Sequence, residues 1–245
     1  MSGMARYGRQ IVLPEFGVNG QQLLRDSAAL VVGVGGLGCA ASQYLAAAGI
    51  GRLTVIDRDR VELSNLQRQV LYTQDDVGRP KAEAARDRLL ALNGDVEVVA
   101  RVEAAAAGSL EVRLRDTDIV LDCSDNFPTR FAVNAACVAA RKPLVSGAAI
   151  RFEAQLALFD SARGGPCYAC LYADTGEAQE RCEDAGVLGP VVGVIGSMQA
   201  LLAMRRLVGL GDDAGRLQLW DAARLTWRTL SVSRDTNCAV CGRAG

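Results

Sequence analysis

The residues best suited to chemistry are the glycines of segment 33–38, which reads Gly-Val-Gly-Gly-Leu-Gly. This segment directly follows the apolar run 28–32, a pattern typical of a strand that turns into a helix. Asp57 ends the next apolar run, 53–56, where its carboxylate could accept hydrogen bonds from ribose hydroxyl groups. Four glycines would let the backbone approach a phosphate at the N–H groups that begin the helix: Gly33, Gly35, Gly36 and Gly38. The chain is therefore predicted to bind an adenine nucleotide.

A second group of polar side chains follows and is suited to phosphate oxygens. The loop after the second apolar run carries Asp59, an amide at Asn65 and a fixed cation at Arg68. Lys81 follows Pro80, a residue favoured in the first turn of a helix, so its ammonium group would add to the positive end of the helix dipole. Each residue alone is also typical of a charged surface. Together with the glycines they favour phosphoryl or nucleotidyl transfer over hydride transfer.

Asp125 and Asn126 come shortly after the apolar run 118–123. Open α/β sheets bind ligands at the carboxyl ends of their strands, so both residues are candidate nucleotide contacts. The Asp125 carboxylate is predicted to hold Mg²⁺, and an ordinary surface charge is the alternative. A site with these groups would bind a triphosphate from several sides.

The cysteines predict a metal site. The chain has eight cysteines and no histidine, and four of the cysteines form two Cys-x-x-Cys pairs separated by 67 residues. Two such pairs predict a tetrahedral, structural Zn²⁺ site, with a redox dithiol or two disulfides as alternatives. The zinc would hold the C-terminal tail against the middle of the chain. The predicted ligands are Cys167, Cys170, Cys238 and Cys241.

The other cysteines divide into two kinds. Cys39, Cys123 and Cys137 lie in apolar contexts and are predicted to be small buried hydrophobic residues. Cys182 lies in the charged segment 176–186, next to an arginine that would favour a thiolate and several acids that would oppose it. Either a solvent-exposed bystander or a covalent role fits this position.

Composition excludes several classes of function. Without histidine, no Ser-His-Asp or Cys-His nucleophilic machinery can exist within the chain. A net charge of −1 gives no electrostatic reason to bind nucleic acid or an acidic membrane surface. The uncharged stretch 185–204 is rich in glycine, which favours a loop and a buried helix over a membrane span of ~20 strongly apolar residues. The first segment also lacks the length of a signal peptide, so we expect a cytoplasmic protein.

The order of elements predicts an α/β fold with a doubly wound, Rossmann-like, mostly parallel sheet. The expected strands of this part are 28–34, 53–57, 96–100, 118–123 and one that opens at 143–145. The expected helices are a short one ending at 25, then 38–48, 80–92 and 126–141. Polar alternation predicts antiparallel strands at the C-terminal edge, at 153–159, 217–220 and 228–232.

Longer motifs extend these observations across the chain in a fixed order. They are Arg6-Tyr7-x-Arg9-Gln10-Ile11, the glycine segment 33–38, Asp57, Leu-Ser-Asn-Leu-Gln-Arg-Gln at 63–69, Gly-Arg-Pro-Lys at 78–81, Asp-Cys-Ser-Asp-Asn at 122–126, Val-Ser-Gly-Ala-Ala at 145–149 and both cysteine pairs. In these motifs the chain resembles the ThiF/MoeB family, bacterial relatives of ubiquitin-activating enzymes. The resemblance covers essentially the whole chain.

The resemblance implies an ATP-dependent reaction. A ubiquitin-like sulfur carrier protein with a Gly-Gly tail, ThiS-like or MoaD-like, would present its C-terminal carboxylate to Mg·ATP. Attack on the α-phosphate would release pyrophosphate and leave a carrier acyl-adenylate, ahead of thiocarboxylate formation in thiamine or molybdopterin cofactor biosynthesis. Because a carboxylate is already a nucleophile, this chemistry needs no histidine base. It needs charge stabilisation and positioning.

The resemblance also implies roles for individual residues. Asp57 would hold the ribose, while Arg68 and Lys81 would stabilise the triphosphate beside an Mg²⁺ ion on Asp125. In the family, an N-terminal arginine reaches the triphosphate of the neighbouring subunit, and Arg9 occupies that motif position here. The active site would then be composite and the enzyme an obligatory homodimer.

The C-terminal part is expected to bind the carrier. We expect one adenylation domain, 1–245, with an N-terminal helical arm at 1–27, a nucleotide-binding half at 28–147 and a carrier-binding half at 148–245. The segment 171–184 resembles the family's crossover loop, in which Cys182 could join the activated carrier covalently. With no fused rhodanese domain in the sequence, sulfur is expected from a separate donor of the cysteine desulfurase or rhodanese type.

Two other functions fit parts of the sequence. An NAD-dependent oxidoreductase would need only the glycine segment and Asp57, and it would bind dinucleotide without Mg²⁺. A non-catalytic, zinc-stabilised partner-binding module would need only the cysteines. The presence of Arg68, Lys81 and Asp125 together argues against both.

Overall fold

One eight-stranded sheet organises the molecule, with the strand order β3-β2-β1-β4-β5-β6-β7-β8. The computed structural model describes residues 3–172, 186–211 and 213–242. The strands are β1 (Ala28–Val32), β2 (Arg52–Ile56), β3 (Glu97–Arg101), β4 (Ile119–Asp122), β5 (Leu144–Ile150), β6 (Glu153–Phe159), β7 (Arg216–Asp221) and β8 (Thr226–Ser231).

The first five strands of the sheet are parallel and the remaining three are antiparallel. β2 and β4 flank β1 in parallel, and β3 and β5 extend the sheet in parallel on either side. The chain then returns through β6, β7 and β8 as an antiparallel meander. The predicted fold class is confirmed, including the antiparallel C-terminal edge. The predicted boundary at residue 147 falls within β5, and the division into two functional halves stays a prediction.

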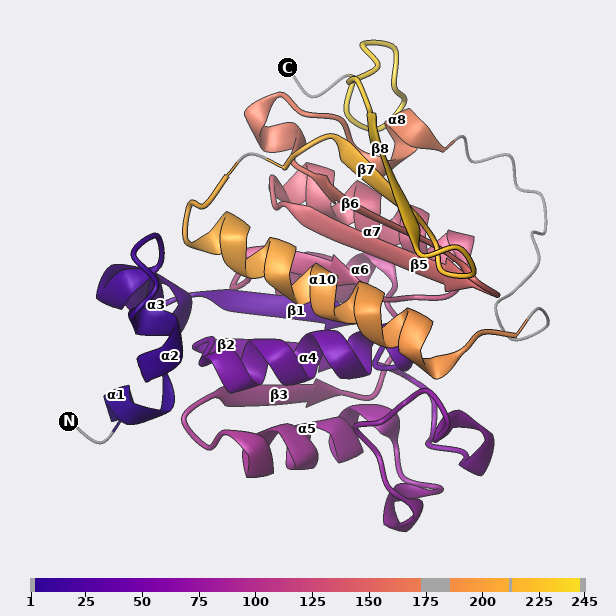
Figure 1. The fold of residues 1–245 in the computed structure, drawn as a ribbon. Coiled ribbons are helices and arrows are strands. Elements are labelled where there is room, and N and C mark those ends of the chain that lie inside the picture. The colour runs from indigo at the N-terminus through magenta and orange to yellow at the C-terminus, as the bar shows by residue number, and fades with distance from the viewer. Residues whose placement is uncertain (1–2, 173–185, 212, 243–245) are drawn as a thin grey trace.

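Helices cover both faces of the sheet (Figure 1). α4 (Gly36–Ala48), α5 (Lys81–Leu92) and α10 (Gly189–Leu207) lie on one face, and α6 (Ala107–Leu114) and α7 (Phe127–Ala140) lie on the other. The sequence of β1 is apolar without alternation because both of its faces are buried. Val31 belongs to the core on one face of the sheet, and Leu30 belongs to the core on the other face. A strand buried on both faces needs an unbroken apolar run.

The remaining helices are short. An arm of α1 (Gly3–Arg6), α2 (Gly8–Ile11) and α3 (Gly17–Arg25) precedes the sheet, and α8 (Tyr168–Leu171) follows β6. Three single-turn 3₁₀ helices are η1 (Leu63–Asn65), η2 (Gln74–Asp76) and η3 (Ser161–Arg163). The arm lies near the amino ends of the parallel strands, where the side chain of Gln21 donates to the carbonyl of Ala48 at the end of α4.

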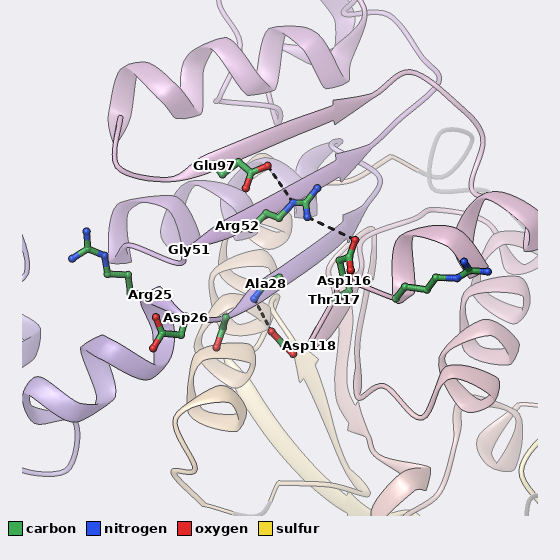
Figure 2. A pocket seen from close by; sticks show the side chains of 11 residues that line it. Arg25, Asp26, Ala28, Gly51, Arg52, Glu97, Asp116, Thr117 and Asp118 are labelled. Atoms are coloured by element: carbon green, nitrogen blue, oxygen red, sulfur yellow. Dashed lines mark hydrogen bonds and ion pairs between the residues drawn. The ribbon is translucent and has the colours of Figure 1, made fainter.

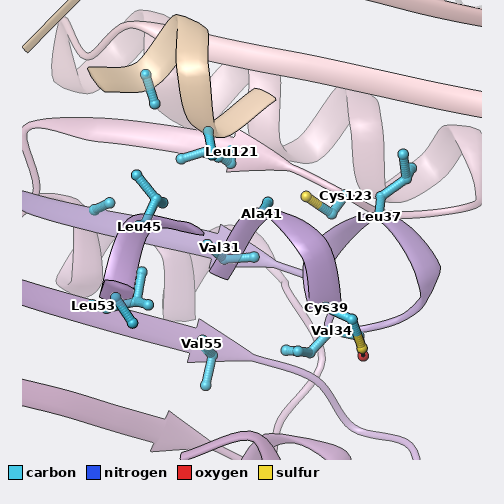
Figure 3. Packing of buried hydrophobic residues seen from close by; sticks show 14 of the residues in the cluster. Val31, Val34, Leu37, Cys39, Ala41, Leu45, Leu53, Val55, Leu121 and Cys123 are labelled. Atoms are coloured by element: carbon cyan, nitrogen blue, oxygen red, sulfur yellow. Dashed lines mark hydrogen bonds between the residues drawn. The ribbon is translucent and has the colours of Figure 1, made fainter. Parts of the chain in front are cut away.

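The close packing of α4 against its neighbours sets the position of the glycine segment. Leu37, Ala41 and Leu45 of α4 belong to the same core as Val31 of β1, Leu53 of β2 and Cys123 after β4, and Figure 3 shows these residues together. α10 approaches α4 at Gly196, where a Cβ atom would lie only 2.2 Å from the carbonyl oxygen of Leu37. The helix expected in the uncharged stretch is therefore a core helix. Among the helices in the described part of the chain, none is long and apolar enough to cross a membrane.

Some predicted boundaries are wrong. The first strand ends at Val32 and the following helix begins at Gly36, so both glycine positions between them form the turn itself. Helix α6 was not predicted, because its sequence Ala-Gly-Ser-Leu-Glu-Val-Arg-Leu buries only Leu110 and Leu114. Two buried residues in one short segment give too little periodicity to recognise.

Candidate functional site

The glycine segment turns sharply between β1 and α4. Gly33 has a φ of +86°, and a Cβ atom there would lie 3.0 Å from the backbone oxygen of Cys123 at the end of β4. A Cβ atom at Gly38 would lie 2.0 Å from the carbonyl oxygen of Gly33. Only glycine satisfies both the left-handed backbone and this close contact. These glycines permit the sharp turn that places the first backbone N–H groups of α4, which begins at Gly36, just beyond the carboxyl end of β1, the position of a phosphate-binding helix terminus.

Asp57 follows β2 and connects to the glycine turn. Its carboxylate accepts hydrogen bonds from the backbone N–H of Val34 and of Asp59, both at 2.8 Å. Burial raises the pKa of Asp57, while the nearby ammonium group of Lys81 and the two N–H donors act in the opposite direction. The structure thus holds the predicted ribose-binding carboxylate beside the predicted phosphate loop.

Lys81 begins α5 and is buried beside these acids. Its Nζ atom lies 3.6 Å from Oδ2 of Asp59, and its backbone N–H donates to the Asp59 carbonyl at 2.8 Å. The hydroxyl of Tyr72, a residue not predicted, lies 2.8 Å from the Val34 carbonyl and 3.3 Å from the Lys81 carbonyl. Tyr72 is buried and thereby joins the glycine turn to the start of α5.

The loop that carries Asn65 and Arg68 borders the same region. Asn65 is buried, and its Oδ1 accepts from the backbone N–H of Glu62 at 3.2 Å, which fixes the turn η1. The Arg68 guanidinium donates to the carbonyl of Ser64 at 3.3 Å. Gln69 is buried, and its Oε1 has no hydrogen-bond partner within the described part of the chain. Its Nε2 would lie 3.6 Å from a Cβ at Gly35, so the side-chain amide reaches the glycine turn.

Asp125 is exposed at the end of the loop that leaves β4. Its Oδ1 accepts from the side-chain amide of Asn126 at 3.2 Å, and Asn126 caps α7 by accepting from the N–H of Thr129. The carboxylate is exposed to solvent, and its role as an Mg²⁺ ligand stays a prediction. Because Gly33 touches the backbone of Cys123, the loop of Asp125 lies directly beside the glycine turn.

Two buried polar residues that were not predicted support this loop. Arg130 of α7 donates to the carbonyls of Ser124 and Gly147, and it lies 3.8 Å from the buried Asp122 carboxylate. Gln199 of α10 donates to the carbonyl of Asp122 at 2.8 Å. The only feature of the sequence that could have identified Arg130 and Gln199 is that each is a polar residue on an otherwise apolar face of its helix.

Arg9 lies elsewhere in the chain. It is exposed on α2, and its neighbour Tyr7 packs against Gly49 and accepts a hydrogen bond from Asn93 at 2.8 Å. Gly49 ends α4, whereas the glycine turn begins this helix of 13 residues. A helix of this length spans about 20 Å. One chain therefore does not bring Arg9 to its own glycine turn.

The four cysteines of the two pairs come together. Their sulfur atoms all lie within 4.8 Å of one another, with 3.7 Å between Cys167 and Cys238 and 3.4 Å between Cys170 and Cys241. Tetrahedral Zn²⁺ with bonds of about 2.3 Å requires sulfur separations of roughly 3.8 Å. Burial acts to raise the pKa of Cys238, but the N–H groups of Cys241 and Val240 bring it down to about 7. The cluster fits one tetrahedral metal ion.

The remaining cysteines differ in environment. Cys39, Cys123 and Cys137 are buried, as predicted, and burial raises the pKa of Cys39 to about 12. A thiol of this kind is unreactive. Cys182 and the segment 173–185 lie outside the described residues, so its predicted role is not tested.

A polar hollow of about 400 Å³ lies at the amino ends of the parallel strands, the end of the sheet away from the glycine turn. It is formed at the amino ends of β1 and β2, and Figure 2 shows Arg52 between Glu97 and Asp116 in it. The two ion pairs measure 3.4 Å and 4.0 Å. Because ligands of parallel sheets bind at the carboxyl ends, this hollow is separate from the glycine turn.

Comparisons with known proteins agree with this geometry. The model of the ThiF family matches residues 7–240. "Molybdopterin-synthase adenylyltransferase" of Escherichia coli K12 is 47% identical over 241 residues, which cover 98% of this chain and 97% of that protein. "Sulfur carrier protein ThiS adenylyltransferase" of the same organism is 45% identical over 237 residues, covering 97% and 94%.

Solved structures share the fold. E. coli MccB with ATP superposes with a TM-score of 0.84 at 25% identity, over 97% of this chain and 74% of that one. The microcin C7 biosynthetic enzyme MccB in complex with N-formylated MccA gives a TM-score of 0.86 at 25% identity, over 97% and 75%.

Proposed function

The chain belongs to the ThiF family, and from this premise we propose that it adenylylates the C-terminal carboxylate of a ubiquitin-like sulfur carrier protein. The observation that carries the proposal is the meeting of the glycine turn, Asp57 and Lys81 at the carboxyl end of the sheet, where Asp57 accepts from Val34 at 2.8 Å. The two E. coli relatives named for carrier adenylylation match this chain almost end to end. A solved neighbour was crystallised with ATP.

In the proposed reaction, the backbone at the start of α4 binds the nucleotide phosphates and Asp57 binds the ribose. The cations Arg68 and Lys81 offset the repulsion between the carrier carboxylate and the triphosphate. The carboxylate attacks the α-phosphorus, and the bond to the bridging oxygen breaks as pyrophosphate leaves. No proton transfer is required, which agrees with a chain that lacks histidine.

Asp125 is the proposed ligand for Mg²⁺, since its carboxylate is exposed and, within the described part of the chain, accepts a hydrogen bond only from the Asn126 amide. Mg²⁺ bound there would neutralise phosphate charge. Zn²⁺ is the proposed ion for the four cysteines, and its role is structural because all four positions are filled by protein.

Arg9 is proposed to act in the active site of a second subunit. Its place at the far end of α4, about 20 Å from the glycine turn, supports action in trans rather than in its own chain. The functional unit would then be a homodimer with two composite sites. We also propose that a separate protein supplies sulfur to the adenylate, and that Cys182 is the residue to test for a covalent carrier adduct.

ATP–pyrophosphate exchange with Mg²⁺ tests the proposal, using ThiS-type and MoaD-type carriers side by side. Carrier-dependent exchange is expected with one of them, and that carrier assigns the pathway. Identity to the two E. coli relatives differs by only 2 percentage points (47% and 45%), so it does not choose between the pathways. A carrier cut before its Gly-Gly tail is the matched control. Measurable ATP binding with no exchange for either carrier would reject the proposal.

A further inference from the structure

Helix α7 carries two buried polar side chains one turn apart. Arg130 is 4% exposed and Asn134 is 1% exposed, and the spacing of four residues places both on one side of the helix. Each contacts a different functional region. A helix is stiff over one turn, so whatever fixes one of these residues also constrains the other.

Asn134 contacts the cysteine cluster. Its Oδ1 accepts a hydrogen bond from the backbone N–H of Tyr168 at 2.9 Å, and its Nδ2 donates to the sulfur of Cys167 at 3.7 Å. Tyr168 is buried and packs edge-on against Phe131, with ring centroids 5.5 Å apart. The first Cys-x-x-Cys pair is therefore attached to α7 by both a polar and an apolar contact.

Arg130 contacts the loop of Asp125. Its guanidinium donates to the carbonyl of Ser124, the residue directly before Asp125, and to the carbonyl of Gly147 at 2.9 Å. Asp122 completes the arrangement, since its Oδ1 accepts from the N–H and hydroxyl of Ser124 at 3.0 and 2.6 Å. The backbone that presents Asp125 is thus fixed by a side chain of α7.

We propose that Asn134 is a positioning residue that couples the four-cysteine site to Asp125 through Arg130. With Zn²⁺ on the four cysteines, the Cys167–Tyr168 segment would hold Asn134, and Asn134 in turn would fix α7. Arg130 then holds the Ser124 carbonyl so that the Asp125 carboxylate faces the nucleotide. This inference rests on the proposed function for the zinc at the cysteines and for the role of Asp125 in binding Mg·ATP.

The test compares two variants with the wild type by two measurements that need no carrier. Asn134→Ala removes both hydrogen bonds. The control is Arg234→Ala, because Arg234 donates to the Cys241 carbonyl at 2.6 Å and so supports the second Cys-x-x-Cys pair. The measurements are zinc release to a chelator and calorimetric binding of ATP across a range of Mg²⁺ concentrations.

Asn134→Ala is expected to weaken zinc retention by about 10- to 100-fold, the usual effect of losing a group that orients a metal ligand. It should also raise the Mg²⁺ concentration needed for tight ATP binding several-fold. Arg234→Ala should also weaken zinc retention, but with zinc at saturating concentration it should keep the wild-type Mg²⁺ dependence, whereas zinc-free wild type should show the raised Mg²⁺ requirement of Asn134→Ala. An unchanged Mg²⁺ dependence in Asn134→Ala would overturn the proposal, as would an equal shift in Arg234→Ala. Absence of carrier-dependent ATP–pyrophosphate exchange in the wild type would instead reject the proposed function.

Discussion

Lys81 illustrates how a single buried charge can be kept available for a ligand. Its side chain is only 10% exposed, yet its acidic partner Asp59 is 58% exposed and 3.6 Å away. A triphosphate can therefore take over the contact without breaking a close, buried ion pair. We expect Lys81→Ala to lower carrier-dependent pyrophosphate exchange by on the order of 10²-fold, as loss of a group that stabilises transition-state charge does.

Lys142 provides the matched control for this substitution. It is the only other lysine of the chain and lies just before β5, at the amino end of a parallel strand. Lys142→Ala should leave the exchange rate unchanged, and both variants should retain the wild-type Tm within a few degrees. An exchange rate of Lys81→Ala equal to the wild-type rate would contradict the role of Lys81.

At the residue scale, the site divides into a part that sequence could predict and a part that it could not. Asp57 and Lys81 stand beside local signals, the glycine turn and Pro80, so their positions near each other were predictable from spacing. Tyr72 and Arg130 act on backbone carbonyls far along the chain, at Val34 and Gly147. No local pattern encodes such a contact, and only the fold brings the partners together.

At the element scale, the turn η2 is tied to α5 by a buried carboxylate. Asp76 accepts from Arg79 at 2.9 Å and from Arg88 at 3.0 Å, and its side chain is 1% exposed. Burial alone would raise the pKa of Asp76, but the Thr73 N–H and the two guanidinium groups lower it below its usual value. Residues 77–80, which join η2 to α5, lead directly into Lys81, so this network of hydrogen bonds fixes where α5 begins.

A lowered pKa gives the Asp76 network a defined pH dependence. The stabilisation is present above the ordinary pKa of 3.8 and is lost as pH falls through the lower folded-state value. Asp76→Asn is expected to reduce the free energy of unfolding by about 2 kcal/mol at neutral pH, as loss of charged hydrogen bonds does. Urea titrations should show this difference shrinking below pH ~4, where the Asp76 carboxylate of the unfolded wild-type chain becomes protonated, and vanishing once the folded-state carboxylate is protonated as well. Asp75→Asn, an exposed neighbour, should have no effect at either pH, and a constant difference for Asp76→Asn would contradict the assignment.

The elements themselves were predictable where burial is strong. β1, β2 and β4 are nearly uninterrupted apolar runs because helices cover both faces of the sheet. β8 is exposed along its whole length, and only its polar alternation indicated a strand. α6 was missed because it buries two side chains, which is too few to set a helical period.

At the scale of the whole molecule, the proposed composite active site would make activity depend on two subunits. Arg9→Ala and Lys81→Ala should each be nearly inactive alone. Mixing them under conditions that allow subunit exchange should restore up to about one quarter of wild-type exchange activity, because half the dimers are mixed and each of these has one intact site. Mixing without recovery would place Arg9 in its own chain's chemistry or outside the reaction.

The cysteine cluster connects segments that are otherwise far apart in the sequence, so its metal should stabilise the whole chain as a loop closure. The two pairs are separated by 67 residues, which include β7 and β8. We expect removal of zinc by a chelator to lower the Tm by about 10 °C and to increase hydrogen exchange in segments 167–172 and 233–242. Cys241→Ser is the control, because a chelator should not change its Tm further. Full reactivity of all eight cysteines in the native protein, with no bound metal, would show that the cluster has no such role.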